Sequence, residues 1–256
     1  MSHHKLEFKN VHFTYPDGNK AINDVSFCIR HGESVGIIGA NGAGKSTLLM
    51  LMMGIVFACQ GEILVGDIHV TKKTLPMIRQ RLGMVFQNPD DQLFMTTVYD
   101  DVAFGPRNYK MDEEDVVKKV NYALEVVGIS HLKDRAPFKL SGGEKRSVSI
   151  ATVLSMQPDI LIMDEPTSSL DPKSRRKVIN LLKSFEHTKV ITSHDLDMVY
   201  EVCNRVIVLK DGRIMSDGSA GEILTNGGLL EECGLEIPLS LKSCPRCGST
   251  IGRVQE

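Results

Sequence analysis

The sequence predicts an α/β domain with a largely parallel β-sheet, and two observations support this fold class. Short apolar runs rich in β-branched residues are typical of strands buried on both faces, and longer segments with helical spacing lie between them. The expected strands are residues 35–38, 160–163, 189–192 and 205–209. The expected helices are residues 45–53, 112–127, 143–155 and 172–185. Strands and helices that alternate along a chain indicate a layered α/β arrangement.

Two stretches interrupt this alternation. Residues 6–30 alternate apolar and polar side chains on either side of the turn at residues 16–19, a pattern typical of antiparallel strands. Residues from about 89 to 155 have a helical pattern, which indicates an inserted helical subdomain. We therefore expect one domain over residues 1–225, with the helical insertion, and a C-terminal tail over residues 226–256.

Composition excludes several classes of protein. The chain has 256 residues, of which 42% are hydrophobic and 24% charged, so it is neither disordered nor fibrous. Its formal charge of −2 provides no basic footprint for nucleic acid. The longest apolar run, residues 48–59, is too short to span a bilayer, and the first residues lack the apolar core of a secretory signal. The six cysteines form no disulfide framework. We expect a cytoplasmic chain that contacts a membrane only through a partner.

The most specific local motif follows the first expected buried strand. Residues 39–47 read GANGAGKST and fit the pattern G-x-x-x-x-G-K-[ST]. Glycines let the backbone curl so that its N–H groups surround phosphates, Lys45 reaches the β- and γ-phosphates, and Ser46 ligates Mg²⁺. The nucleotide contacts predicted from this loop are Gly39, Asn41, Gly42, Gly44, Lys45, Ser46 and Thr47.

A second motif ends the expected strand at residues 160–163. Asp164 and Glu165 are adjacent carboxylates that would be costly to bury without a cation. Asp164 is suited to hold Mg²⁺, and Glu165 to act as general base on the attacking water. The alternative is a solvated strand end that starts a turn.

Further motifs follow in a fixed order. They are LSGGEKR at residues 140–146, DEPT at 164–167, SLD at 169–171 and TSHD at 192–195. Together with the phosphate loop, this set closely resembles the ATP-binding-cassette (ABC) ATPase family over most of the chain, up to about residue 225. The resemblance implies a P-loop NTPase fold of ABC type, with a RecA-like core, an antiparallel β subdomain and an inserted helical subdomain.

The resemblance also implies a role for each matching residue. The Ser141 and Gly143 signature loop would close on the γ-phosphate bound by the opposite protomer. Gln87 would sense Mg²⁺ and water, and His194 would contact the γ-phosphate and hold Glu165. The implied catalytic set is Lys45, Gln87, Glu165 and His194, and the implied Mg²⁺ set is Ser46, Gln87 and Asp164.

Two of the matching positions keep a second interpretation, and a third position departs from the family pattern. Tyr15 matches the aromatic residue that stacks on adenine, and it is otherwise an exposed hairpin aromatic. Asp171 matches the loop that communicates across the dimer, and it is also placed to cap the helix that starts at Pro172. Glu144 stands where many members of the family have glutamine, a difference that we expect to alter local hydrogen bonding rather than abolish activity.

Three segments narrow the resemblance further. VFQNPDDQLF at residues 85–94, TVYDDVAFGP at 97–106 and LLEECGLEIP at 229–238 look like the ATPase subunits of energy-coupling-factor importers, close to the cobalt and nickel branch. This implies an ATP-hydrolysing subunit that powers uptake of a transition-metal ion (cobalt or nickel) or a vitamin. It would lie peripherally at the cytoplasmic face of the membrane, as a homodimer or a heterodimer with a paralogous ATPase. Its membrane partners would be an integral coupling protein, docked in a groove of residues 86–106, and a substrate-binding component.

Two other functions are considered. A soluble ABC ATPase that acts on nucleic acid or ribosomes is the main alternative, but such proteins usually have a coiled-coil insertion or a second cassette. A catalytically dead regulator would be expected to lack Glu165 or His194, and both are present.

The C-terminal turn CPRCG contains a cysteine pair. Cys244 and Cys247 could hold half of a tetrahedral zinc site, and two tails in a dimer would supply four thiolates. The alternative is a flexible tail with two reduced thiols, or a redox or metal-sensing role.

Overall fold

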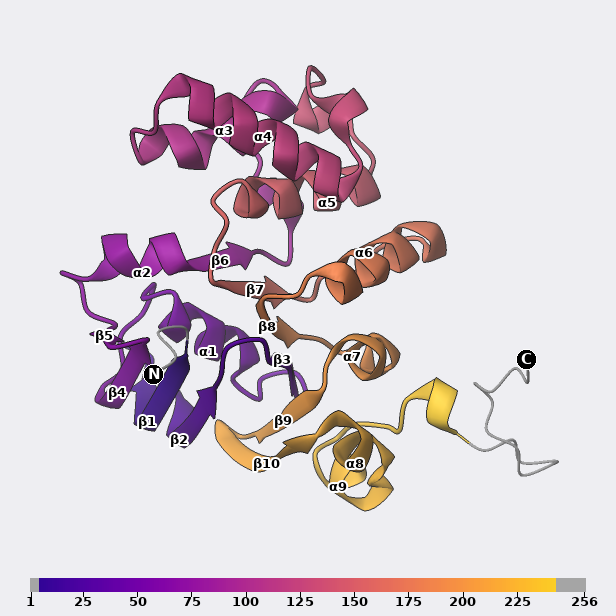
Figure 1. The fold of residues 1–256 in the computed structure, drawn as a ribbon. Coiled ribbons are helices and arrows are strands. Elements are labelled where there is room, and N and C mark those ends of the chain that lie inside the picture. Colours follow the sequence, from indigo (N-terminus) through magenta and orange to yellow (C-terminus); the bar gives the residue numbers. More distant parts are fainter. Residues whose placement is uncertain (1–4, 243–256) are drawn as a thin grey trace. The chain divides into compact units, whose positions relative to one another are not determined.

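The computed structural model describes residues 5–242, which form two compact units. The first unit consists of the chain up to Leu75 and the chain from Thr188 onward, and the second is Pro76–His187. In Figure 1 the first unit is therefore coloured indigo and orange to yellow, and the second is mostly magenta to light orange.

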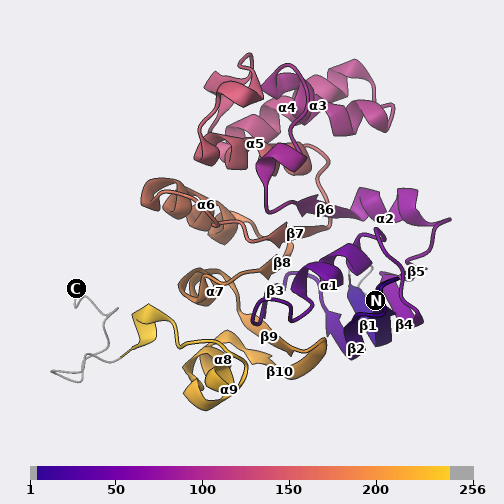
Figure 2. The same ribbon diagram turned by 180° about the vertical axis from the view of Figure 1, so that it is seen from behind.

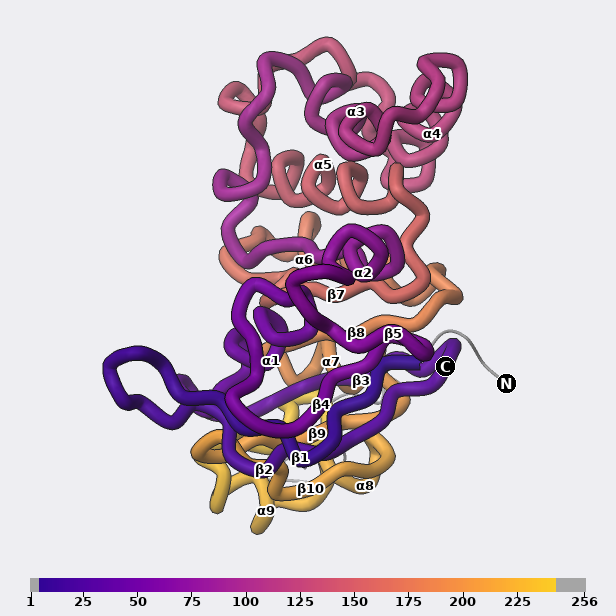
Figure 3. The backbone as a smooth tube through the Cα atoms, turned by 90° about the vertical axis from the view of Figure 1, so that its left-hand side faces the viewer, coloured from indigo at the N-terminus to yellow at the C-terminus, as the bar shows by residue number. Residues whose placement is uncertain are grey.

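An antiparallel sheet forms the N-terminal part of the first unit. Its strands are β1 (Leu6–Thr14), β2 (Lys20–Ile29), β4 (Gln60–Val65) and β5 (Ile68–His69), in the order β2-β1-β4-β5. Figure 3 shows β1, β2 and β4 running side by side. Phe8 and Phe27 stack on the inner face with ring centroids 4.6 Å apart. The antiparallel pairing predicted over residues 6–30 is confirmed.

Parallel strands form the rest of the first unit's β structure. Strand β3 (Ser34–Ile38) lies between β8 (Thr188–Thr192) and β9 (Arg205–Lys210) and is parallel to both. Every residue of β3 and β8 is buried, as the continuous apolar runs predict. Strand β10 (Arg213–Ser219) adds antiparallel to β9. The helices described in this unit are α1 (Lys45–Met52), α7 (Leu196–Val202), α8 (Ala220–Thr225) and α9 (Gly227–Glu232).

The second unit combines a parallel strand pair with helices. Strand β6 (Leu82–Val85) pairs with β7 (Ile160–Asp164). The helices are α2 (Leu75–Arg81), which begins at the boundary, α3 (Val98–Asn108), α4 (Glu113–Val127), α5 (Gly142–Leu154) and α6 (Pro172–Ser184). Helices α3, α4 and α5 come between β6 and β7 in the sequence. They pack on one another (Figures 1 and 2). The α/β fold class, with an antiparallel sheet and a helical subdomain, is confirmed.

Helix ends follow the expected capping chemistry. The helices predicted from periodicity match α1, α4, α5 and α6 to within one residue at each end. Helix α6 starts at Pro172 because the Asp171 carboxylate accepts hydrogen bonds from the N–H groups of Lys173 and Ser174. Thr97 caps α3 in the same way, through the N–H of Asp100.

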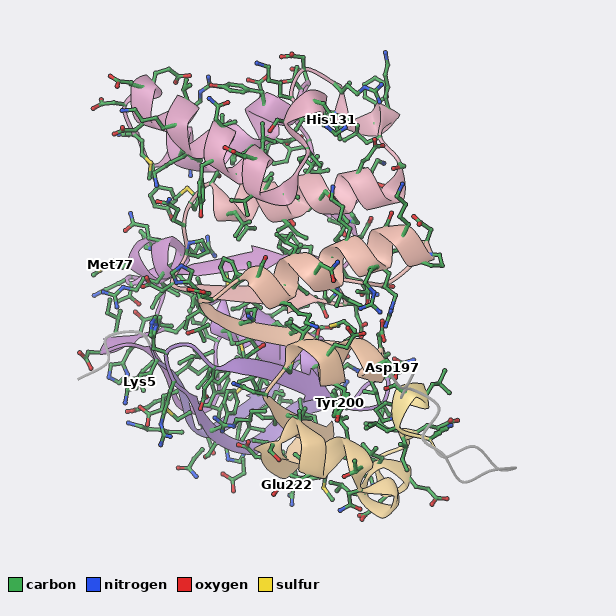
Figure 4. All side chains as sticks on the ribbon, turned by 45° about the vertical axis from the view of Figure 1, so that its right-hand side comes forward. Lys5, Met77, His131, Asp197, Tyr200 and Glu222 are labelled. Atoms are coloured by element: carbon green, nitrogen blue, oxygen red, sulfur yellow. The ribbon has the colours of Figure 1, made fainter. Side chains whose placement is uncertain are left out.

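The described residues beyond α8, residues 226–242, pack against other parts of the first unit. Leu230 and Cys233 are buried, and a Cβ atom at Gly234 would lie 3.6 Å from the Cβ of Ala40, in the phosphate loop. Both carboxylate oxygens of Asp197, on α7 (Figure 4), accept backbone N–H groups, from Leu239 at 3.2 Å and Ser240 at 2.8 Å. Leu239 and Ser240, in the predicted tail, are thus hydrogen-bonded to α7. Among residues 5–242, none of the helices has the length and apolarity needed to cross a membrane.

Candidate functional site

The phosphate loop joins β3 to α1 in the first unit. Gly44, immediately before α1, has φ +104°, and a Cβ atom there would lie 2.7 Å from the carbonyl oxygen of Ala21. Only glycine fits this position without strain and a steric clash. The loop is held from the other side by the N–H of Gly212, which donates to the carbonyl of Ala43 at 3.1 Å. The curl that the glycine pattern predicts is present.

Lys45 and His194 meet at this loop. The buried Lys45 Nζ donates to the carbonyl oxygens of Gly39 (2.8 Å) and Ala40 (3.1 Å) and lies 3.2 Å from His194 Nε2. An ammonium group can only donate, so His194 Nε2 is the acceptor in this contact. His194 follows β8, and the fold brings it beside Lys45 although the two residues are 149 positions apart.

Tyr15 also lies beside the loop. Its hydroxyl is 3.0 Å from Thr47 Oγ1, and its ring packs edge-on against Phe13 with centroids 4.9 Å apart. The hairpin turn fixes the backbone of Tyr15, whose N–H donates to the carbonyl of Asn19 at 2.9 Å. This position next to the phosphate loop is compatible with the adenine-stacking prediction, which stays a prediction.

The donor set of the loop fits a nucleotide phosphate group. Gly42 lies on an open side of the loop, where a Cβ atom would meet no atom within 4 Å. Ser46 and Asn41 are exposed, and Lys45 supplies a positive charge at the N-terminus of α1. Residues 5–242 contain no cluster of three or more His, Cys, Asp or Glu side chains that could hold a metal ion by themselves. The predicted zinc ligands Cys244 and Cys247 lie outside the described residues.

Asp164 and Glu165 lie at the end of β7 in the second unit. Both side chains are largely buried. Glu165 has φ +47°, a left-handed conformation that is rare for a side-chain-bearing residue and is common at functional sites. The carbonyl of Glu165 accepts the N–H of Ser168 at 3.1 Å, which closes a turn behind it. The sequence predicted this carboxylate pair but contained no signal for the unusual backbone of Glu165.

Gln87 follows β6, and its backbone is held from α5. The exposed side chain of Gln87 is in the segment after Val85, the last paired residue of the strand. The carbonyl of Gln87 accepts a hydrogen bond from Arg146 Nη2, and that of Phe86 accepts one from Arg146 Nη1 at 2.6 Å. Burial lowers the pKa of the Arg146 guanidinium, and the nearby Asp164 carboxylate acts in the opposite direction.

Ser141 is the N-cap of α5 and forms a reciprocal capping box with Glu144. Ser141 Oγ accepts the N–H of Glu144 at 3.3 Å, while the Glu144 carboxylate accepts the N–H and hydroxyl of Ser141, each at 2.8 Å. The bonds from the Ser141 backbone and side chain lower the pKa of Glu144. Glu144 therefore stays ionised and holds the hydroxyl proton of Ser141.

Gly143 and Asp171 meet through Ser174. A Cβ atom at Gly143 would clash with the Ser174 side chain, whose Cβ would be 2.7 Å away. Ser174 Oγ donates to Asp171 Oδ2 at 2.5 Å, and this bond is the largest cause of the lowered pKa of Asp171. The helix-capping interpretation of Asp171 is thus correct, and its predicted role across a dimer stays a prediction.

Sequence reasoning missed two residues, Arg146 and Gln92, that hold the chain around Gln87 against α5 in the second unit. Arg146 lies on the buried face of α5, one turn before Ile150, and a charged residue in that register was the available signal. Gln92 accepts the N–H of Phe86 and donates to Ser149 and Thr152 on α5. No local pattern distinguishes Gln92 from a surface glutamine.

Comparison with known proteins decides the family. The model of the family described as ABC transporter matches residues 22–168. A putative ABC transporter ATP-binding protein of Geobacter sulfurreducens is 55% identical over 97% of this chain and 100% of its own length. The chain belongs to the ABC transporter ATP-binding family. It is an ABC ATPase, as the motifs predicted.

Other relatives of this ABC ATPase carry more specific names. An energy-coupling factor transporter ATP-binding protein of Carboxydothermus hydrogenoformans is 42% identical over 93% of this chain and 88% of its own. The structure of cbiO1 from Clostridium perfringens, described as part of the ABC transporter complex cbiONQ, is 38% identical, with a TM-score of 0.80 over 89% of this chain and 93% of that one.

A second solved structure contains bound nucleotide. A dimeric ATP-binding cassette in a post-hydrolysis state, bound to ADP and Pi, is 30% identical, with a TM-score of 0.76 over 84% of this chain and 98% of that one. ABC ATPases bind ATP with Mg²⁺, dimerise and work with membrane components.

Proposed function

We propose that this chain is the ATP-hydrolysing subunit of an energy-coupling-factor importer. It acts peripherally at the cytoplasmic face of the membrane, as a homodimer or with a paralogous ATPase. Its partners are an integral coupling protein and a membrane component that binds the substrate, a transition-metal ion (cobalt or nickel) or a vitamin. The names of the relatives support this assignment because energy-coupling factor transporters and a cbiONQ complex occur among them.

The observation that carries the proposal is an exposed aromatic pair next to the Gln87 segment. Phe94 is 64% exposed and Phe104 is 42% exposed, and their rings form a T-shaped contact with centroids 4.9 Å apart. The carboxylate of Asp101, on α3, accepts the N–H groups of Phe94 and Met95 at 3.0 Å each, which fixes the loop. Exposed aromatic side chains on a fixed backbone are typical of protein docking surfaces. We call Phe94 and Phe104 the aromatic pair.

The positions of the phosphate-loop residues support the roles proposed for them. The loop N–H groups and Lys45 bind the phosphates, and Lys45 exchanges its bonds to Gly39, Ala40 and His194 for phosphate oxygens. Mg²⁺ bound with the nucleotide, held by Ser46, Gln87 and Asp164, would neutralise phosphate charge.

The remaining roles belong to water activation and to the second chain of the dimer. The Glu165 carboxylate orients the attacking water and accepts its proton. His194 contacts the γ-phosphate and holds Glu165 in position, and the Tyr15 ring stacks on the adenine. Ser141 and Gly143 contribute their helix N-terminus to the nucleotide of the other chain. Asp171 serves communication between the two chains.

Co-expression tests the proposal. The chain is expressed with the membrane coupling and substrate-binding components from the same organism and purified through the coupling protein. We expect a stable complex whose ATPase activity accompanies cellular uptake of cobalt, nickel or a vitamin, each measured separately. A complex that does not form, or uptake that is independent of this chain, would exclude the importer function.

Variants of the aromatic pair locate the docking surface. Phe94→Asp should abolish co-purification with the coupling protein but leave the ATPase rate of the isolated chain within about twofold, because Phe94 lies outside the nucleotide-binding residues. Tyr122→Asp is the matched control, since Tyr122 is about half exposed on α4 and outside the aromatic pair. Equal loss of partner binding in both variants would contradict the assigned surface.

A further inference from the structure

Three side-chain links join helix α5, which begins at the signature serine Ser141, to residues 86–92, which we call the Gln87 segment. Lys145 Nζ donates to Asp90 Oδ1 at 2.6 Å at the surface. Gln92 Nε2 donates to the carbonyl of Ser149 at 2.9 Å and to Thr152 Oγ1 at 2.7 Å. The third link is Arg146, and it differs from the others because it is buried.

Arg146 is 1% exposed and contacts the backbone of the Gln87 segment directly. Its two terminal nitrogens donate to the carbonyls of Phe86 and Gln87, and within the described residues its Nε has no hydrogen-bond partner. A guanidinium in such a place loses much hydration, so its burial is compensated only by groups held in fixed positions. The two carbonyls and the field of Asp164 are those groups.

The carbonyls of Phe86 and Gln87 need this partner. Pairing of β6 with β7 ends at Val85, so neither residue is part of the strand ladder. Arg146 supplies the hydrogen bonds that a neighbouring strand would otherwise supply. It thereby fixes the directions of the two peptide groups on either side of the Gln87 Cα. The direction in which the Gln87 side chain leaves the backbone depends on those planes.

We propose that Arg146 is a positioning residue that acts through Gln87. It holds the Gln87 backbone against α5, so that the Gln87 side chain, the signature serine at the start of α5 and the Asp164 carboxylate keep one relative arrangement within the second unit. The inference rests on the proposed role of Gln87 at Mg²⁺ and water.

A double-mutant cycle in the full-length chain tests this inference. The variants are Arg146→Met, Gln87→Ala and the double variant, and the measured quantity is the Mg²⁺ concentration that gives half-maximal ATPase activity. Arg146→Met and Gln87→Ala should each raise this concentration about tenfold, and the double variant should differ from Gln87→Ala by less than about twofold. Additive effects would show that Arg146 does not act through Gln87 and would overturn the inference.

Amide hydrogen exchange of the nucleotide-free chain provides a second readout. Arg146→Met should speed exchange in residues 86–92 about tenfold or more and leave β3 and β8 unchanged. Lys145→Met is the matched control, since it removes the exposed link one residue away on α5 and should change neither readout by more than about twofold. Unchanged exchange in residues 86–92 of Arg146→Met would also overturn the inference.

The conservative variant separates positioning from folding. If Arg146→Met does not fold, Arg146→Lys replaces it in the cycle, since lysine keeps the charge and can reach one carbonyl but not both in fork geometry. Arg146→Lys should shift the Mg²⁺ requirement by an intermediate factor of about three. A folded Arg146→Lys protein with the wild-type Mg²⁺ requirement and wild-type exchange contradicts the inference, whereas a wild-type chain without Mg²⁺-dependent turnover contradicts the proposed function itself.

Discussion

The two groups of site residues are built by different physical means. In the first unit the phosphate loop depends on backbone geometry. Gly44 has a positive φ, and the backbone carbonyls of Gly39 and Ala40 hold the Lys45 ammonium group. In the second unit the positions of Gln87 and Ser141 depend on side chains, namely Arg146 and Glu144. The first group supplies donors for phosphate and the second supplies the carboxylates. Binding and hydrolysis should therefore be separable by mutation.

The largest expected effect is that of Glu165→Gln in the second unit. Removal of a general base costs about 10²–10⁴-fold in turnover, while the phosphate loop remains intact. We expect ATP binding within about threefold of wild type, accumulation of an ATP-bound dimer and near-complete loss of phosphate release. These are measured by fluorescent nucleotide titration, light scattering and phosphate assay. Wild-type turnover would contradict the role of Glu165.

Gly44→Ala should produce the opposite phenotype. A side chain at φ +104° costs about 1–3 kcal/mol in strain, and its Cβ would clash with Ala21. We expect nucleotide affinity to fall about tenfold or more, measured by the same titration. Gly221→Ala is the control, because that position in α8 is open and has no positive φ. If Gly44→Ala bound ATP normally, the loop would not depend on its backbone geometry.

Asp101 tests how a side chain fixes the loop that carries Phe94, one member of the aromatic pair. Asp101→Ala removes the acceptor of two backbone N–H groups and should lower the free energy of unfolding by about 1–3 kcal/mol, measured by urea denaturation. Asp101→Asn keeps an acceptor and should be milder.

Because Asp101 is buried, the difference in stability between wild type and Asp101→Asn should depend on pH. Burial raises the pKa of Asp101, so the folded state binds this proton more tightly than the unfolded state. The stability of wild type relative to Asp101→Asn should fall as pH rises from the unfolded pKa of about 4 through the raised folded pKa. A difference that is constant with pH would show that Asp101 is not desolvated in solution.

Glu144→Gln should give the smallest effect. Glutamine also completes a capping box, so the free energy of unfolding at pH 7 should change by less than about 0.5 kcal/mol. The pKa of Glu144 is lowered, so its contribution is present above the unfolded pKa of about 4.5 and is lost as pH falls through the lower folded value. Urea denaturation between pH 3 and 7 should thus show a slope opposite to that of Asp101. Glu144→Ala, which cannot cap, should cost about 1 kcal/mol.

The same contrast explains which parts of the molecule could be predicted. The phosphate loop and the helix starts at Asp171 and Ser141 were predictable because their geometry depends on local residues. Arg146 and Gln92 could not be placed, since their partners are about 60 residues away in sequence and are backbone carbonyls or polar atoms that any sequence provides. The left-handed backbone of Glu165 was also out of reach, because non-glycine residues with positive φ have no reliable local signal.

The hydrogen bonds between Asp197 and residues 239–240 decide where a reporter protein can be attached. A fluorescent protein fused after Thr225, in place of the residues that follow, would remove the two amide donors of Asp197 and the buried side chains of Leu230 and Cys233. It would also remove Gly234 from its place beside Ala40, and the phosphate loop would lose part of its packing. A reporter joined beyond residue 242 leaves all of these contacts in place, so fluorescence measurements of nucleotide binding should use that junction.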